Sequence, residues 1–331
     1  MNTYSTIRVG VAGATGYAGV ELLRRLARHP AADLRLAMGS STSEARRVPA
    51  LARIWDNPVV PFDLDRLAAE SDVVFLAVPD TLAAEVAPEL TARGARVLDL
   101  SGAFRLRDDD ERRRWYPDAP VMNVPVAYGL TERNRPALRD ARLIACPGCY
   151  PTAALLALQP LVAAGLIQEG VVIDAKSGIS GAGKTPSERT HFSECHGSVS
   201  AYGVFSHRHG AEIEQELGRP VTFVPHLVPL DRGIFESIYA RLQPGTTAAD
   251  VARVLGAAYE DSPFVRLTGS DLPEIKHVAH TNFCDIGWRV DRPGGQLVLV
   301  ACIDNLIKGA AGQAIQNFNV AVGLDETLGL N

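Results

Sequence analysis

The sequence predicts an α/β protein in two parts: a Rossmann-like, doubly wound domain, and an α+β domain with a mainly antiparallel sheet. Three observations predict this fold class. Short apolar runs alternate with amphipathic runs over residues 7–100. A glycine-rich turn separates the first apolar run from the first amphipathic run. After residue 170 the strand-like runs are longer and helical runs are few, which is typical of an antiparallel sheet.

The composition suits a folded chain with two cores. The chain has 331 residues, of which 47% are apolar and 21% charged, and its net charge is −5. A mildly acidic chain without a run rich in Lys and Arg argues against a nucleic-acid or membrane partner. The five cysteines are sparse and odd in number, and no signal peptide precedes residue 7, so we expect a reducing cytoplasm.

The first element is a strand over residues 7–12, followed by a turn and a helix. Glycines at 10, 13, 16 and 19 follow a GxxGxxG spacing, and apolar residues recur between Val20 and Leu26. Small residues let the backbone approach a pyrophosphate, and the first amides of a helix bind it. We therefore predict a dinucleotide site at this turn, formed by Gly13, Thr15, Gly16, Tyr17 and Gly19.

The second strand, residues 34–38, indicates which dinucleotide binds. An NAD site usually places an acidic residue after this strand, where it binds the ribose hydroxyls. Here the strand is followed by hydroxyl side chains, with two arginines just beyond them. We expect Ser40, Ser41 and Arg46 to bind the 2′-phosphate of NADP. The alternative interpretation is that the arginines lie on an ordinary solvated loop.

Two more strands and a helix continue the alternating pattern. We predict strands over residues 73–78 and 97–100, with a helix over 82–92 between them. In a parallel sheet of this kind, ligands bind at the carboxyl ends of the strands. Arg105 follows such an end, where a guanidinium can bind a phosphate through two parallel hydrogen bonds. Residues 108–114 carry mixed charges and predict an exposed helix start.

Cys149 lies in a turn that leads into an apolar helix. Pro147 and Gly148 favour a tight turn, and Pro151 suits the first position of a helix because it lacks an N–H. Cys149 is therefore expected at a helix N-terminus, where unpaired amides and the helix dipole lower the pKa of a thiol. A thiolate at neutral pH is a strong nucleophile.

The second part of the chain is predicted to be rich in strands. The loop over residues 178–184 follows the first of them and is not expected to be the phosphate loop of a nucleoside triphosphatase. One helix is expected over residues 248–260 and another over 309–322. The predicted strands span residues 171–177, 222–228, 234–242, 282–290 and 296–303.

Histidines supply candidates for an acid–base group. If Gly210 begins a helix, Glu212 lies within reach of His209 and orients its ring, as acid–base catalysis requires. His226 is a rival candidate. Cys146 and Cys149 form a CxxC pair, but with no second pair a structural zinc site is a weak hypothesis. A thioredoxin-like dithiol is also disfavoured, because the pair follows a whole nucleotide-binding domain.

Four motifs together resemble those of the N-acetyl-gamma-glutamyl-phosphate reductases (type 1), which are related to the aspartate-semialdehyde dehydrogenases. They are CPGCYPT at 146–152, GATGYAG at 13–19, HRH at 207–209 and DNLIKGAAGQA at 304–314. The resemblance implies that Cys149 is the nucleophile and His209 the acid–base residue, and we add Glu212 to the catalytic set because its spacing lets it orient His209. It also implies that the last helix returns to the NADP-binding domain, which would comprise 1–148 with 305–331, leaving 149–304 for a catalytic and dimerisation domain. Further assignments are Ser180, Gly181 and Asn305 to the cofactor, and Arg105, Lys184 and His207 to the substrate.

The family's activity implies a reaction for this chain. It is the NADPH-dependent reduction of N-acetyl-glutamyl 5-phosphate to the 5-semialdehyde through a cysteine thioester, in arginine biosynthesis, by a cytoplasmic homo-oligomer (dimer or tetramer). Two alternatives stay open: reduction of an aminoadipyl or glutamyl phosphate bound to a carrier protein, in lysine biosynthesis, and a non-enzymatic NADP-binding sensor. An extended short-chain dehydrogenase is disfavoured because no tyrosine has a lysine four residues later.

Overall fold

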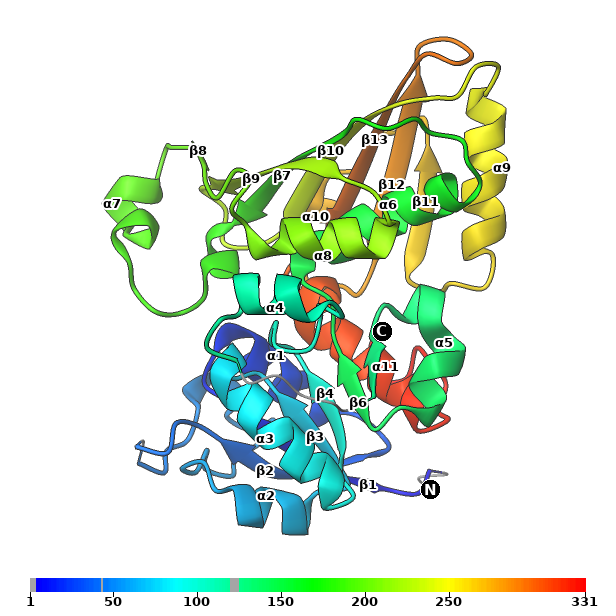
Figure 1. The fold of residues 1–331 in the computed structure, drawn as a ribbon. Coiled ribbons are helices and arrows are strands. Elements are labelled where there is room, and N and C mark those ends of the chain that lie inside the picture. Colours follow the sequence, from blue (N-terminus) through cyan, green and yellow to red (C-terminus); the bar gives the residue numbers. More distant parts are fainter. Residues whose placement is uncertain (1–3, 43, 120–124) are drawn as a thin grey trace. The chain divides into compact units, whose positions relative to one another are not determined.

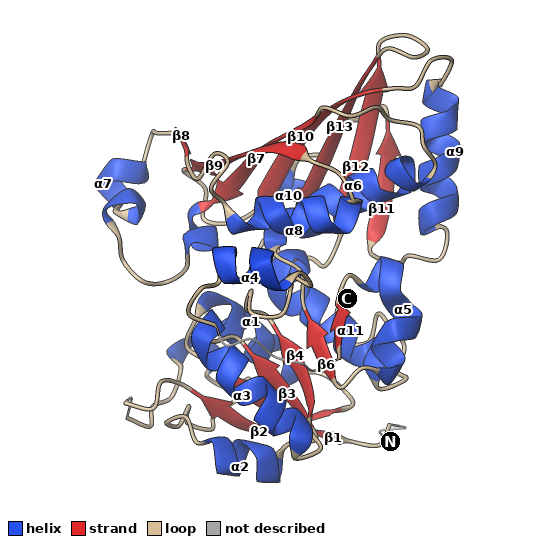
Figure 2. Ribbon diagram, in the orientation of Figure 1, coloured by secondary structure: helices blue, strands red, loops and turns tan. Residues whose placement is uncertain are grey.

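The computed structural model describes residues 4–42, 44–119 and 125–331. The chain forms two compact units. The first unit contains the chain up to Pro147 and the C-terminal segment Ala310–Asn331, and the second unit is Gly148–Gly309. Figure 1 colours both along the sequence, and Figure 2 colours them by secondary structure.

The first unit is built on a parallel sheet. Its strand order in the described residues is β2-β1-β3-β4-β6-β5, and every neighbouring pair is parallel. The predicted doubly wound domain is therefore confirmed. The strands are β1 (Ile7–Ala12), β2 (Ala32–Met38), β3 (Val73–Leu76), β4 (Arg96–Asp99), β5 (Val126–Tyr128) and β6 (Leu143–Ala145). The helical segments are α1 (Tyr17–Leu26), η1 (Pro49–Leu51), α2 (Leu64–Glu70), α3 (Asp80–Ala92), α4 (Asp109–Trp115), α5 (Thr131–Asp140) and α11 (Gly312–Ala321).

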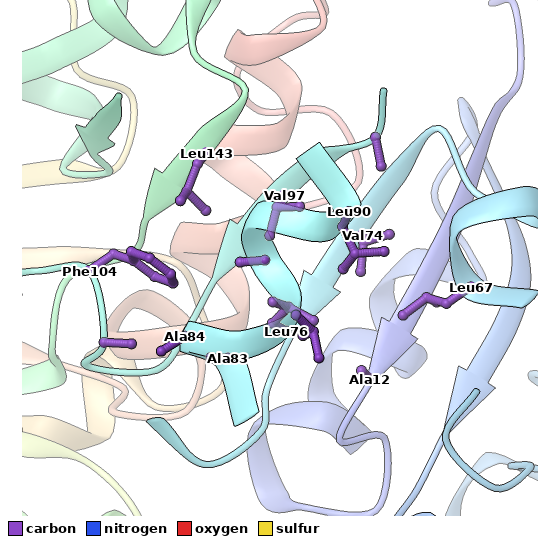
Figure 3. Close-up of a cluster of buried hydrophobic side chains, with 14 of the residues drawn as sticks. Ala12, Leu67, Val74, Leu76, Ala83, Ala84, Leu90, Val97, Phe104 and Leu143 are labelled. Carbon is purple, nitrogen blue, oxygen red and sulfur yellow. The ribbon is translucent and has the colours of Figure 1, made fainter. Parts of the chain in front are cut away.

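Helix α3 closes one hydrophobic core against this sheet (Figure 3). Ala83 and Ala84 of α3 are buried against strand residues such as Val74 and Leu76. Alanines let the helix backbone come close to the sheet, so the larger strand side chains fill the space between the layers. All four residues of β3 are buried, as expected for a central parallel strand covered on both faces.

The C-terminal helix α11 packs into the first unit through buried polar groups. The side-chain amide of Asn317 donates to the carbonyl of Gly129 at 2.8 Å and accepts from the hydroxyl of Thr131 at 2.6 Å. Gln313 also donates to the carbonyl of Gly129, at 3.1 Å. The sequence predicted one helix over residues 309–322. The structure instead places a π-helical turn, η4 (Ile307–Ala311), before α11.

The turn between β1 and α1 needs glycine at two positions. Gly13 has a φ of 82°, and a Cβ atom there would lie 2.0 Å from the carbonyl oxygen of Ala77. A Cβ on Gly19 would lie 2.2 Å from the carbonyl oxygen of Gly13. Gly16 is different, because its nearest neighbour would be 3.5 Å away, at an ordinary contact distance. The backbone packs too closely at Gly13 and Gly19 for any side chain, whereas the space beside Gly16 is not filled by the turn.

This difference gives a stability prediction. Gly13→Ala should lower the free energy of unfolding by more than about 2 kcal/mol, because it adds both an overlap and a left-handed backbone strain. Gly16→Ala should cost at most about 1 kcal/mol, as for a changed N-cap residue. Thermal or urea unfolding of the two variants measures the difference. Equal losses would contradict the role given to Gly13.

The second unit is built on a mixed sheet. Its strand order in the described residues is β11-β12-β13-β10-β7-β9-β8. Only the β11–β12 and β7–β9 pairs are parallel, so the predicted mainly antiparallel sheet is confirmed. The strands are β7 (Val171–Gly178), β8 (Ser200–Ala201), β9 (Val221–Val228), β10 (Ile234–Arg241), β11 (Val265–Gly269), β12 (Cys284–Val290) and β13 (Gln296–Ile303).

Helix α6 (Cys149–Ala163) is the central helix of the second unit. It packs on β10, β12 and β13, and it is flanked by α8 (Arg208–Leu217) and α9 (Ala248–Tyr259). Most of its residues are buried, which fits its apolar sequence. The remaining helical segments are η2 (Ile179–Ala182), η3 (Glu188–Thr190), α7 (Phe192–Cys195) and α10 (Ile275–Val278). In the described residues, no helix combines the length and apolar character that a membrane span needs.

Candidate active site

Cys149 is the first residue of α6, so the helix N-terminus predicted from the Pro-Gly turn is confirmed, but it begins two residues before Pro151, the expected first residue. The N-cap residue is Gly148, and no side chain caps this end of the helix with a hydrogen bond. Cys149 is partly exposed, whereas Cys146 three residues earlier is buried. Burial raises the pKa of the Cys146 thiol to about 12, so it stays protonated at neutral pH. All five cysteines are free thiols.

Glu212 holds the turn that presents Cys149. Its carboxylate is fully buried, and Oε1 accepts a hydrogen bond of 2.9 Å from the backbone N–H of Gly148. Gly148 is the N-cap of α6 and Glu212 belongs to α8, 64 positions away in the sequence. This hydrogen bond fixes the backbone next to the cysteine.

The imidazole of His209 lies against the same turn. A Cβ atom on Gly148 would be 2.5 Å from Nε2 of His209, so the ring occupies the space that a side chain would need. Gly148 therefore has a second reason to be glycine, besides its place in the turn. His209 and Glu212 both contact Gly148, the residue that precedes Cys149, and their catalytic roles stay predictions.

Helix α8 begins two residues earlier than expected. The sequence predicted a start at Gly210, but the helix begins at Arg208 and His207 is its N-cap. Nδ1 of His207 accepts a hydrogen bond of 3.1 Å from the backbone N–H of His209, which performs the task of an Asn or Ser cap. Burial, and secondarily the charge of Arg208, lower the pKa of His207 to about 4. His207 is therefore neutral at pH 7.

The lowered pKa of His207 predicts an acid-sensitive fold. An unfolded histidine takes up its proton near pH 6.5, while the folded one resists protonation until about pH 4. The contribution of neutral His207 to the free energy of unfolding is therefore fully present above about pH 6.5. It is lost as the pH drops from about 6.5 to 4, which lowers the free energy of unfolding by about 3 kcal/mol. His207→Asn keeps a capping oxygen and removes the titration. Urea unfolding at several pH values should show a weaker acid loss in the variant. An unchanged pH dependence would contradict this assignment.

An aromatic cluster that the sequence did not predict surrounds the histidines. Tyr150, next to the cysteine, packs edge-on against His207, His209 and Phe223, with ring centroids 5.3–6.0 Å apart. Its hydroxyl donates to the carbonyl of His226 at 3.1 Å and lies 3.3 Å from the hydroxyl of Tyr202. The hydrogen-bonded Tyr150 hydroxyl fixes the first turn of α6 to β9. Tyr150 is adjacent to Cys149 in sequence, which is the only signal that points to it.

His226, the rival acid–base candidate, lies on the other face of the sheet. On β9, Phe223, Pro225 and Leu227 are buried, and His226 alternates with them. Its Nδ1 lies 3.2 Å from a carboxylate oxygen of Asp174, which also binds Lys176 at 2.6 Å. Tyr150 contacts Phe223, so the cysteine helix covers the opposite face. Within the second unit, the geometry favours His209 for a role at Cys149.

Three of the residues predicted to bind the cofactor come together in the second unit. The amide nitrogen of Asn305 donates to the hydroxyl of Ser180 at 3.0 Å, and its oxygen accepts from the N–H of Gly233 at 2.7 Å. Gly181 lies beside them, since its Cβ would be 3.8 Å from the Asn305 amide. Lys184 follows in an exposed stretch.

The loop after β7 has the spacing of a phosphate loop but not its structure. Residues 178–185 in fact complete the GxxxxGKT spacing of a phosphate loop, so spacing does not exclude a triphosphatase. The structure does, because a phosphate loop leads into a helix whose N-terminus faces the phosphates. Here the 3-10 turn Ile179–Ala182 comes first, and no helix begins at Gly183 or Lys184.

The first unit holds the other predicted residues. Thr15 and Gly16 precede α1, and Tyr17 is its first, exposed residue. Ser40, Ser41 and Arg46 are exposed after β2, whose end Met38 pairs with Ala12 of β1. They therefore lie at the same sheet edge as the glycine turn. Arg105 is buried, and its guanidinium donates at 2.8 Å to the carbonyls of Cys146 and Leu100.

Arg105 therefore also supports the segment that leads to the cysteine. Its bond to the carbonyl of Cys146 joins the loop after β4 to the end of β6. A substrate contact for Arg105 stays a prediction. Among the described residues, no group of three or more His, Cys, Asp or Glu side chains is arranged to hold a metal ion.

Comparison with known proteins defines the class. Residues 8–141 match the NAD-binding domain of the semialdehyde dehydrogenases, and residues 149–305 match the dimerisation domain of the same proteins. The structure resembles aspartate semialdehyde dehydrogenase II of Vibrio cholerae, with a TM-score of 0.74 and 20% identity over 96% of this chain and 99% of that one. The fold and the two domain matches are thus those of a semialdehyde dehydrogenase-like protein.

The chain belongs to the N-acetyl-gamma-glutamyl-phosphate reductase family. It is 45% identical to the protein of that name from Shouchella clausii and 46% identical to the one from Desulforudis audaxviator. Each comparison covers 98% of both chains. The resemblance inferred from the four sequence motifs is therefore confirmed.

Proposed function

We propose that this protein reduces N-acetyl-glutamyl 5-phosphate to N-acetyl-glutamate 5-semialdehyde and phosphate with NADPH, in arginine biosynthesis. One arrangement carries the proposal: Cys149 begins α6, and both His209 and Glu212 contact Gly148 beside it. A non-enzymatic sensor has no need of a partly exposed cysteine at a helix N-terminus with an imidazole and a buried carboxylate around it. Membership of the reductase family supports the choice of substrate.

Cys149 acts as the nucleophile. Its thiolate, favoured by the amides and the dipole of α6, attacks the acyl carbon of the substrate. The bond between that carbon and the phosphate oxygen breaks, phosphate leaves, and a thioester forms on Sγ. A thioester keeps its carbonyl electrophilic enough for reduction, whereas a carboxylate does not. The backbone of the Gly148 turn, fixed by Glu212, sets where the sulfur lies.

His209 acts as the acid–base group of the second half of the reaction. It protonates the carbonyl oxygen of the thioester as that carbon is reduced, and it takes the proton back when the carbon–sulfur bond breaks. The products are then the aldehyde and the Cys149 thiolate, ready for another cycle. The position of the His209 ring against Gly148 supports this role over one for His226.

The first unit fits NADP(H). Helix α1 begins without a side-chain cap and without an acidic residue in its first turn, and Gly16 leaves room for a pyrophosphate. Residues 39–42, directly after β2, include no acidic side chain, and Ser40, Ser41 and Arg46 suit a 2′-phosphate. When bound, NADPH supplies the hydride for the thioester carbon. We assign Thr15, Tyr17, Ser180, Gly181 and Asn305 to the same cofactor.

The remaining assignments extend the proposal. Arg105, Lys184 and His207 are assigned to the substrate, with His207 contributing its neutral N–H and not a charge. The functional domains are 1–148 with 305–331, and 149–304. A homo-oligomer fits the match of residues 149–305 to a dimerisation domain. A cytoplasmic location fits the five free thiols.

The reverse reaction tests the proposal. Purified protein should form NADPH from NADP⁺ when both N-acetyl-glutamate 5-semialdehyde and phosphate are present, measured by NADPH absorbance. Omitting phosphate should stop the reaction, because the thioester then has no acceptor. Reduction of a carrier-linked acyl phosphate only, with none of the free substrate, would favour the carrier-dependent alternative. NADP binding without any reduction would favour the sensor.

A further inference from the structure

Glu236 is a buried acid in an apolar position of β10. Burial alternates along this strand, so Ile234, Glu236 and Ile238 point to one face of the sheet. All three are fully buried. The proposed reaction does not use Glu236, and acids are almost never fully buried unless they are paired.

The pairing of neighbouring strands shows which face of the sheet carries Glu236. The ring of Tyr150 contacts Phe223, with centroids 5.3 Å apart. Phe223 is opposite Ile173 on the neighbouring strand β7, and Ile173 is opposite Ile238 on β10. Residues directly opposite each other share a face of the sheet. Glu236 therefore lies on the face that α6 covers.

The contacts of Gly309 show where Glu236 lies along β10. A Cβ atom there would lie 2.7 Å from Cβ of Cys149 and 3.3 Å from Cδ1 of Ile303. Ile303 is opposite Ile234 on β10. Glu236 is two residues further along that strand and on the same face, so it lies about 7 Å along the strand from Ile234. The strand pairing and the contacts of Gly309 both place Glu236 beneath the first turn of α6.

The carboxyl group of Glu236 has no partner there. Neither oxygen has a hydrogen bond in the described part of the chain. On its face of the sheet, β7 and β13 contribute no charged group: their facing residues are Ile173, Ala175, Ser177, Leu299, Ala301 and Ile303. Lys176 and Cys302 belong to the opposite face, and Lys176 is paired with Asp174. The only titratable residues of α6 are Cys149 and Tyr150.

A negative charge at Glu236 would be buried without compensation. Such a charge is costly, so the group keeps its proton instead. Burial accordingly raises the pKa of Glu236 well above its usual value, and the charge of Lys176 opposes this as the lesser effect. The hydroxyl of Tyr150 is within electrostatic reach of both Cys149 and Glu236, because both contribute to its raised pKa after burial and Tyr202.

We propose that Glu236 is a positioning residue that acts through Cys149: it keeps its proton during turnover, so that no negative charge beneath α6 opposes the thiolate. This inference rests on the proposed function, in which Cys149 is the ionised nucleophile. The coupling is reciprocal, as any coupling between two sites must be. Glu236 binds its proton most tightly when Cys149 is a thiolate, and less tightly when Cys149 is a neutral thioester.

Infrared spectroscopy of the full-length protein tests the coupling. A protonated carboxyl group has its own C=O stretching band, which disappears when the group ionises. Wild-type protein should show such a band for Glu236 above pH 7, and the band should titrate at a lower pH in Cys149→Ala, by on the order of one unit. The band that is missing from the spectrum of Glu236→Gln is assigned to Glu236. If that variant does not fold, Glu236→Asp assigns it by a shifted frequency.

Asp99 provides the matched control. It is a buried acid of the first unit, and burial raises its pKa to about 6. Its band, assigned with Asp99→Asn, should titrate identically in wild type and in Cys149→Ala. A Glu236 band that is absent above pH 7, or that titrates identically in the two proteins, would overturn the inference. No substrate is needed, so this failure is distinct from failure of the reductase assay.

Discussion

Cys149→Ala is expected to abolish reductase activity, with a loss of at least about 10⁴-fold in kcat, as for the removal of other catalytic nucleophiles. The reason is that no other group at the start of α6 offers a nucleophile: Gly148 precedes the cysteine, and the next side chain is the hydrogen-bonded Tyr150. NADPH binding should be unchanged, because the substitution leaves intact every residue assigned to the cofactor: the glycine turn and Ser40 in the first unit, and Ser180, Gly181 and Asn305 in the second. Steady-state kinetics and NADPH fluorescence titration measure the two effects.

Cys195 provides the control for Cys149. It is also a partly exposed free thiol in the second unit, but it ends the short helix α7 and has no place at a helix N-terminus. Cys195→Ala should keep wild-type kcat. If the two alanine variants lost activity equally, or if Cys149→Ala kept substantial phosphate-dependent activity, Cys149 would not be the nucleophile.

His209→Asn is expected to lower kcat by about 10²- to 10⁴-fold, the usual contribution of a general acid–base group. Asn is close in size to imidazole, so the space beside Gly148 stays filled while the titratable group is lost. The pH profile of kcat should also lose the limb that reports this histidine. KM should change little, because the proposed contact of His209 is made as the carbonyl oxygen gains charge.

His226→Asn is the matched substitution on the opposite face of the same sheet. His226 contacts Asp174 and the carbonyl of Ala175, away from the start of α6. Activity of His226→Asn should stay within a few-fold of wild type. A large loss in His226→Asn together with a small one in His209→Asn would reverse the assignment of the acid–base group.

Local sequence patterns predicted the parts of this protein that depend on neighbouring residues. The alternation of apolar and amphipathic runs predicted the parallel sheet, and Pro147, Gly148 and Pro151 predicted a helix N-terminus next to Cys149, two residues later than the observed start. Strands β5 and β6, with three residues each, β8 with two and β11 with five were not predicted. Strands of two or three residues have too few positions for a period of two to be visible, and tertiary packing decides them.

Contacts between distant residues were less predictable. Glu212 was expected near His209, but its bond to Gly148 spans 64 positions and depends on the packing of α6 against α8. The start of α8 was misplaced because histidine is not a usual capping residue, although His207 acts as one here. The burial of Glu236 is indicated in the sequence, because this acid lies between two isoleucines on one face of a strand.

The central claim is that the sulfur of Cys149 holds the acyl group of the substrate. Mixing the protein with N-acetyl-glutamyl 5-phosphate in the absence of NADPH, quenching in acid and digesting should give a peptide that carries the N-acetyl-glutamyl group on Cys149, identified by mass spectrometry. Addition of NADPH before the quench should remove the adduct and release the semialdehyde. Phosphate release with no acyl adduct, or an adduct on a different cysteine, would contradict the account.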